Sequence, residues 1–165
     1  MPTEQVEIPK PPLNQETPRG TYKVQLDWEP TTIEPGKEVE FAFTFFDSTG
    51  FPLQRVSYNF VVTDGDGKTV VDLKNKFTDS GTDFQKVTFD KGGSKTVSVT
   101  INSVNGQDTG QFTETADFNI MVVPEFPVSA AIIAAAVIAL AIAVTRLRGT
   151  GTTSFGSMFG GRNPL

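Results

Sequence analysis

The chain of 165 residues is 38% hydrophobic and 20% charged, a balance typical of a globular protein. It contains no His and no Cys, which excludes disulfides, thiol chemistry and the commonest metal ligand and general base. Residues 1–125 hold all 19 acids against 11 Lys and Arg, a net charge of −8, so they lack the basic surface that binds DNA or RNA.

Residues 1–20 contain five Pro and few apolar side chains, which predicts an extended, partly disordered leader or spacer. They lack the basic start and the apolar stretch of a secretory signal peptide. The membrane topology inferred below requires export of the domain. We therefore expect that a signal was removed ahead of this numbering, or that the start is mis-assigned.

From position 21 the sequence alternates between apolar and polar residues, which is the pattern of half-buried β-strands. Turn residues, mostly Gly, Pro, Asn and Asp, separate the alternating stretches. Seven strands are predicted, over residues 22–28, 39–45, 56–62, 69–73, 84–89, 96–104 and 112–122. This many short strands in about a hundred residues predicts an all-β sandwich with Greek-key connections over residues 21–123.

The inward face of each predicted strand supplies the core. Phe43 and Val99 are assigned to it, and the inward set of the last strand begins at Phe112. Three further aromatic side chains fall in register with core positions: Tyr22, Trp28 and Tyr58. Core packing is favoured for these rings over a surface platform for sugars.

Three stretches resemble the immunoglobulin-like and polycystic-kidney-disease-like sandwich modules of surface proteins. They are the entry from Trp28 to the Pro35-Gly36 turn, the Tyr58-Asn59-Phe60 strand with its Asp-Gly turn, and the stretch from Phe89 to Val99. The resemblance covers residues 21–123 and lacks the disulfide of antibody domains. It implies a seven-stranded immunoglobulin-like sandwich that serves adhesion, spacing or ligand display.

Residues 128–144 form an uncharged, Ala-rich run, which predicts a transmembrane helix over 128–145. With Pro127 the run spans about 27 Å at the helical rise, close to the hydrocarbon thickness of about 30 Å. The alternative, a buried helix of a soluble domain, is disfavoured because no other segment can cover it. Arg146 and Arg148 follow at once, so the positive-inside rule places the sandwich outside the cytoplasmic (plasma) membrane and a flexible tail, residues 146–165, in the cytoplasm.

Pro124, Glu125 and Phe126 precede this run. Together with the span and the Arg pair, they resemble the archaeal C-terminal sorting signals that archaeosortase-type membrane peptidases process. Two features depart from that pattern: Pro127 replaces the Gly of one version, and residues 149–165 extend past the basic pair. The alternative is a permanent helix, with residues 124–127 as a hinge.

The sequence offers no catalytic constellation and implies no cofactor, so we expect no enzyme. A Ser-Lys arrangement or a carboxylate pair for glycoside hydrolysis has no supporting motif. Asp64 and Asp66 are candidate Ca²⁺ ligands, because two carboxylates stand two residues apart among glycines. A plain hairpin turn is favoured for this segment.

These observations predict a membrane-anchored, extracytoplasmic structural or interaction module of the cell surface, without catalysis. Its expected partners are membrane lipid and other surface or integral-membrane proteins, and not nucleic acid. The alternative is an accessory single-span subunit of a larger membrane complex. In that case the Ala-rich helix packs against partner helices, since small residues allow close approach.

Overall fold

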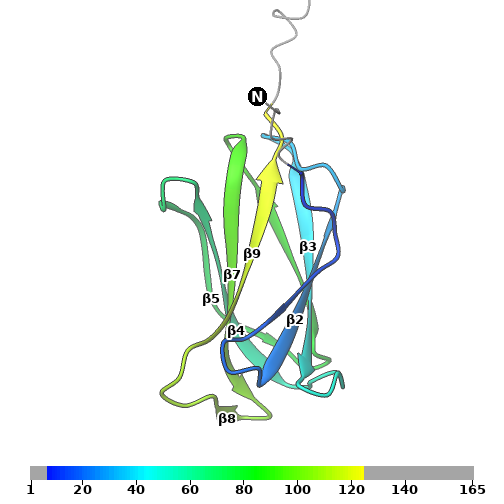
Figure 1. The fold of residues 1–165 in the computed structure, drawn as a ribbon, viewed down its shortest axis with the longest axis vertical. Coiled ribbons are helices and arrows are strands. Elements are labelled where there is room, and N and C mark those ends of the chain that lie inside the picture. Colours follow the sequence, from blue (N-terminus) through cyan, green and yellow to red (C-terminus); the bar gives the residue numbers. More distant parts are fainter. Residues whose placement is uncertain (1–6, 125–165) are drawn as a thin grey trace, which may run out of the picture. The chain divides into compact units, whose positions relative to one another are not determined.

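A computed structural model of the chain describes residues 7–124 (Figure 1). This part contains nine strands and no helix. The strands are β1 (Leu13–Glu16), β2 (Tyr22–Glu29), β3 (Glu38–Asp47), β4 (Val56–Asp64), β5 (Thr69–Thr78), β6 (Thr82–Thr88), β7 (Gly93–Val104), β8 (Gln107–Asp108) and β9 (Glu114–Val122). The predicted all-β class is confirmed, and each of the seven predicted strands corresponds to one of β2 to β7 or to β9. The short strands β1 and β8 add to that set.

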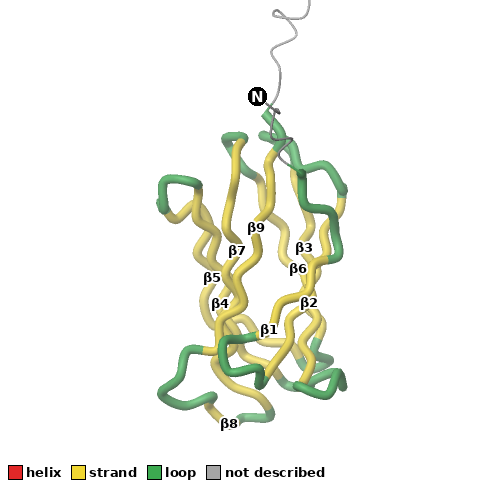
Figure 2. Tube along the Cα trace, in the orientation of Figure 1, coloured by secondary structure: helices red, strands yellow, loops and turns green. Residues whose placement is uncertain are grey.

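The strands form two antiparallel sheets that face each other as a sandwich (Figure 2). The first sheet has the order β1-β2-β3-β6. The second has the order β5-β4-β7, and both β8 and β9 pair with β7. The chain crosses from the first sheet to the second between β3 and β4, returns at β6, and crosses again to β7.

The core lies between the sheets, because apolar and polar residues alternate along the strands and apolar residues face inward. Phe41, Phe43 and Phe45 of β3 are fully buried, as are Tyr58 and Phe60 of β4 in the other sheet. The ring centroid of Phe43 lies 5.0 Å from that of Phe60, and that of Phe45 lies 5.0 Å from that of Tyr58. Tilted pairs at such separations contribute about 0.5–1.5 kcal/mol each beyond the area they bury.

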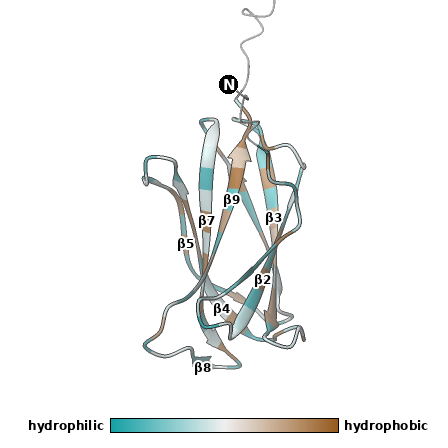
Figure 3. Cartoon of the chain, in the orientation of Figure 1, coloured by the Kyte–Doolittle hydropathy of each residue, from teal (hydrophilic) through white to brown (hydrophobic). Residues whose placement is uncertain are grey.

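Hydropathy alternates visibly along β7 and β9 (Figure 3). On β7, Val97, Val99 and Ile101 are buried, which confirms the core assignment of Val99. Two charged side chains extend these inward rows: Lys95 near the start of β7 is 5% exposed, and Glu114 at the start of β9 is 1% exposed. Within residues 7–124 no other charged residue is buried. Because β7 and β9 are antiparallel, the two lie at opposite ends of the core.

Contacts at the open edge connect the two sheets. Strand β1 lies inside the range predicted as a spacer, and its Leu13 packs against the core. In the connection from β2 to β3, Ile33 forms a parallel bridge with Val122 of β9. The Val123 amide then donates to the Ile33 carbonyl at 2.7 Å. The end of β9 is therefore bound to the first sheet as well as to β7.

The predicted transmembrane helix, residues 128–145, lies outside the described residues, as do residues 125–127 and the tail. In the stretch from 7 to 124, no helix is long and apolar enough to cross a membrane. The unit that contains the sandwich ends at Glu125.

Candidate functional site

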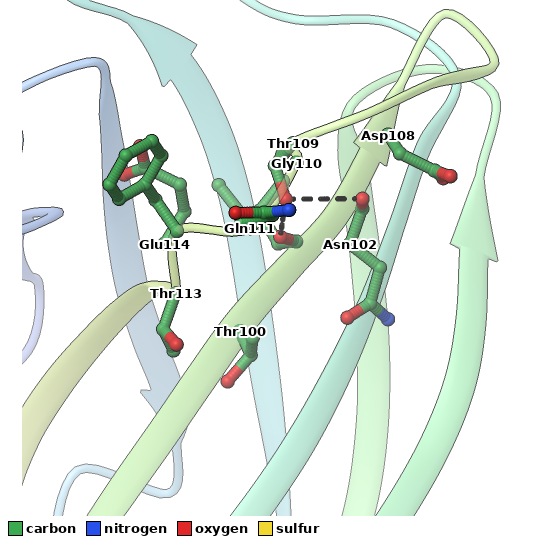
Figure 4. Close-up of a pocket in the computed structure, with 10 residues that line it drawn as sticks. Thr100, Asn102, Asp108, Thr109, Gly110, Gln111, Thr113 and Glu114 are labelled. Atoms are coloured by element: carbon green, nitrogen blue, oxygen red, sulfur yellow. Dashed lines mark hydrogen bonds between the residues drawn. The ribbon is translucent and has the colours of Figure 1, made fainter.

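A polar pocket of about 430 Å³ lies at the end of the sandwich that carries β8 (Figure 4). It is lined by the last residues of β7, by β8, by the loop that leads to β9 and by the first residue of β9. Its polar side chains include Thr100, Asn102, Asp108 and Glu114. In Figure 1 this end of the sandwich is opposite the tip of β9, after which the described chain ends at Pro124. Nine strand residues separate the two ends by about 26 Å.

A tight turn leads into the segment that lines the pocket. Asn105 and Gly106 have φ angles of 52° and 76°, and Val104 on one side pairs with Gln107 on the other. A two-residue turn with positive φ at both positions matches the twist of antiparallel strands, and Asn-Gly is the pair that adopts it most readily. This turn starts β8 and places the following loop beside the end of β7.

A threonine holds that loop against β7. The Thr109 hydroxyl reaches two carbonyl oxygens of β7, that of Ile101 at 3.0 Å and that of Asn102 at 3.2 Å, and the Thr109 amide donates to Asn102 at 2.9 Å. Gly110 follows with a φ of 85°, a conformation that costs glycine little. The chain can therefore turn from β7 toward the start of β9.

Glu114 is the unusual member of this site. Its Oε1 lies 3.9 Å from Nη1 of Arg19, a residue of the turn between β1 and β2. Its Oε2 is buried and has no hydrogen-bond partner among the described residues. Burying a charged group is costly unless it is paired and hydrogen-bonded. The carboxylate is therefore only partly compensated.

Arg19 also contacts the exposed ring of the loop. Its guanidinium carbon lies 4.4 Å from the centroid of Phe112, within the range of a cation–π contact. Phe112 is 60% exposed and the Arg19 side chain is 53% exposed. The assignment of Phe112 to the core is therefore wrong. The strand begins two residues later, at Glu114, which occupies the first inward position, while Phe112 lies in the loop.

A second polar group links the sheets but is not part of the pocket. The Tyr58 hydroxyl donates to Asp83 Oδ2 at 2.7 Å, and the Gln85 amide donates to the same oxygen at 3.1 Å. The pKa of Tyr58 is raised well above its usual 10.0, first by burial and then by the Asp83 carboxylate. The phenol therefore stays protonated and serves as a hydrogen-bond donor from β4 to β6.

The residues singled out from the sequence are not brought together. Asp64 Oδ1 accepts the amides of Asp66 at 3.1 Å and Lys68 at 2.9 Å, so it closes the hairpin between β4 and β5. Asp66 is exposed in that turn. Between residues 7 and 124 there is no group of three or more Asp, Glu, His or Cys suited to a metal. Of the proposed sorting motif, only Pro124 is described; Glu125, Phe126, Arg146 and Arg148 lie outside.

No protein-family model matches the chain, and no curated protein matches it. Among solved structures, the sandwich is similar to the soluble domain of PmoD from Methylocystis sp. ATCC 49242 (Rockwell). The TM-score is 0.50 with 15% sequence identity, over 66% of this chain and 98% of that one. The likeness concerns the fold alone.

The strand pattern does not predict the pocket, because Glu114 stands in an apolar register. Glu114 precedes an apolar alternation at Ala116, Phe118, Ile120 and Val122, and extending that alternation backward gives position 114 an inward place. Because an acid is rarely buried in a core, the pattern favours the more apolar Phe112 as the first core residue. The signal that identifies the site is this charged residue in the apolar register.

Proposed function

We propose that the chain is a membrane-anchored, extracytoplasmic interaction module of the cell surface, without catalysis, that presents its β8 end to a protein partner. The observation that carries the proposal is the Arg19–Phe112 pair beside the polar pocket, since both side chains are largely exposed. Arg and aromatic side chains are enriched where proteins bind one another and dominate their binding energies. The pair lies at the opposite end of the sandwich from Pro124, beyond which the chain continues toward the predicted anchor.

The strand order supports an immunoglobulin-like assignment of the sandwich. With β3 and β6 as strands B and E, and β4 and β7 as strands C and F, the central pairs of both sheets match the immunoglobulin arrangement. With β2 as A and β9 as G, two of the outer strands match as well, whereas β5 pairs with β4 and so takes the place of strand C′ of variable-type domains rather than that of strand D. Domains of this architecture present loops at the two ends of the sandwich, which is where the pocket lies.

Charge and hydropathy support the anchor. The uncharged run of residues 128–144 is followed by Arg146 and Arg148, whereas Glu125 precedes it. Carrying a charged residue into the bilayer centre costs about 2.5–3.5 kcal/mol on insertion scales. This asymmetry favours a cytoplasmic tail and an outside sandwich. Either residues 124–126 are then the recognition motif of a membrane peptidase, or residues 124–127 are a hinge.

The topology is tested by protease treatment of intact cells that express the chain with a tag after Leu165. We expect loss of the sandwich or its leader and protection of the tagged fragment. The matched control replaces Arg146 and Arg148 by Glu, which should lower the protected fraction. Protection of the leader together with loss of the tag would contradict the proposed orientation.

The interaction is tested by mass measurement after mild detergent extraction and in-cell crosslinking. We expect Phe112→Ala to reduce crosslinking to its partner at least fivefold, whereas Phe77→Ala should not. Phe77 is the control because it is 54% exposed but lies on β5, away from the pocket. A stoichiometric assembly that survives extraction and is unaffected by Phe112→Ala would instead support the accessory-subunit function, with the helix as the contact.

A further inference from the structure

A second pocket, of about 160 Å³, lies near the opposite end of the core from the Arg19–Phe112 pair. It is formed by the hairpin between β4 and β5, the connection between β6 and β7, and the start of β7. Figure 1 shows these segments at the end of the sandwich where β9 finishes. A Cβ at Gly92 of the connection would lie 2.8 Å from the Cα of Pro124, so the connection packs tightly against the end of the described chain.

Lys95 is the residue that distinguishes this pocket. It is 5% exposed, it occupies the same inward row as Val97 and Val99, and it lines the pocket. Its side chain makes no hydrogen bond or ion pair with any residue from 7 to 124. Glu114 Oε2 is fully enclosed and has no partner, whereas the Nζ of Lys95 is not fully enclosed. The buried stem therefore delivers its ammonium group into the pocket, in the manner of a snorkelling lysine.

Two more lysines converge on the same space. Lys68 comes from the hairpin and Lys91 from the β6–β7 connection, and both are exposed. Neither forms an ion pair with a described residue. Asp64 and Asp90 also line the pocket, but Asp64 Oδ1 is already bonded to two backbone amides of its turn. The three ammonium groups and the two carboxylates that line the pocket give it a formal charge of +1, in a domain with a net charge of −8.

We propose that this lysine pocket, defined by Lys68, Lys91 and Lys95, binds a phosphate group. The charged donors are all ammonium groups, which bind phosphate as point charges. A planar carboxylate is typically matched by the fork of an Arg, and no Arg lines the pocket. The volume equals about five waters at ~30 Å³ each, which fits a phosphate with its hydration. It is below the ~300 Å³ of a typical organic-ligand site.

Two sources can supply this phosphate: free inorganic phosphate and a phosphomonoester lipid headgroup. The pocket lies at the end of the sandwich where the chain leaves at Pro124, and the apolar run begins four residues later. A headgroup source depends on the proposed anchor, whereas the phosphate site itself does not. Failure of the anchor proposal therefore leaves the pocket testable with inorganic phosphate.

The test is a phosphate titration of the full 165-residue chain in a neutral maltoside detergent, at constant ionic strength set with chloride. Backbone amide NMR signals report binding. We expect saturable shifts confined to the turns around residues 64–68 and 88–95. Lys95→Met should weaken the affinity at least tenfold, and the control Lys74→Met, a side chain 64% exposed on β5, should change it less than twofold. Lys91→Met, at an exposed position where folding is not at risk, should weaken it about threefold.

Shifts that are linear and equal in phosphate and chloride would overturn the proposal, as would an unchanged affinity in both Lys95→Met and Lys91→Met. The lipid arm repeats the titration with dihexanoyl phosphatidic acid and with dihexanoyl phosphatidylcholine, whose phosphate carries a choline. Phosphatidic acid that binds over tenfold more tightly than inorganic phosphate, with the same signals shifted, assigns the site to a headgroup. Equal or weaker binding assigns it to free phosphate.

Discussion

Each end of the sandwich buries one charged side chain, Lys95 of the strand β7 at one end and Glu114 of its neighbour β9 at the other. The two side chains differ in how their charge is accommodated. Near the start of β7, Lys95 extends its stem along the core and its ammonium reaches a pocket. At the start of β9, Glu114 has a shorter stem, and one of its oxygens is enclosed without a partner. A long flexible side chain can bury its carbons and keep its charge in contact with solvent, and a short one cannot. The Glu114 end is therefore the less well compensated of the two.

The largest loss of stability is expected from a substitution in the centre of the core. Phe43 is fully buried and contacts the rings of Phe60 and Tyr58. Phe43→Ala should lower the free energy of unfolding by about 3–5 kcal/mol, because it removes a large side chain and leaves a cavity. Urea unfolding followed by the fluorescence of the single Trp28, which is 4% exposed, measures this. A change within about 0.5 kcal/mol, the range of exposed sites, would contradict the register.

Tyr58 tests the polar link between the sheets; it pairs with Ile101, which in turn pairs with Glu114. Tyr58→Phe should cost about 1.5–3 kcal/mol, since the lost hydrogen bond is to a carboxylate. The pKa of Tyr58 is raised in the folded state, so its contribution is complete below pH 10 and decreases as pH rises above it. Between pH 10 and 12, wild type should lose up to about 1.4 kcal/mol per pH unit more than Tyr58→Phe. Parallel pH profiles for the two proteins would exclude this account.

Glu114→Leu tests whether the poorly compensated end is costly. Replacing an incompletely paired buried charge by an apolar side chain is often neutral or stabilising, and we expect a gain of about 1–2 kcal/mol. Lys95→Met is the matched change at the other end. It should alter stability by less than about 1 kcal/mol, because the methionine keeps the buried stem. A loss of more than about 1 kcal/mol in Glu114→Leu would mean that the carboxylate has a partner.

Arg19→Met should have the smallest effect on folding. The Arg19–Glu114 separation is 3.9 Å and the Arg19 side chain is half exposed, and exposed ion pairs contribute about 0–1 kcal/mol. We expect a loss below about 1 kcal/mol in urea unfolding. In the Glu114→Leu background the same change should cost still less, since the ion pair is absent there. An equal cost in both backgrounds would assign the whole effect to the contact with Phe112.

The strands could be predicted because their inward rows are almost purely apolar, as on β3. The alternation does not predict the full length of a strand when one residue interrupts the pattern. Asn75, with a φ of 54°, interrupts β5 within an irregular stretch of its pairing with β4, so the strand runs to Thr78 although its pattern stops at Leu73. Strand β1 was missed because prolines surround it, yet residues 13–16 all have amides that can pair.

Both pockets depend on residues whose positions the strand pattern does not predict. The alternating pattern predicts a strand that begins at Thr96, so it leaves Lys95 outside the strand. Lys68 and Lys91 come from turns that are far apart in sequence and meet only through the pairing of β4 with β7. The alternation of residues within one strand does not predict which turns of different strands lie side by side. The apolar core can therefore be predicted from neighbouring residues in the sequence, whereas the charged ends depend on residues that are far apart in it.

Strand β9 joins the end that carries the Arg19–Phe112 pair to the end where the chain continues past Pro124. Its nine residues are already extended, at about 3.3 Å each, close to the limit of 3.3–3.6 Å for a stretched backbone. Tension between the proposed partner at Phe112 and the proposed anchor beyond Pro124 would run along the covalent backbone of this strand. Phe112 and Pro124 belong to one continuous stretch of chain, so a pull between them does not have to pass through the hydrogen bonds that join β9 to β7.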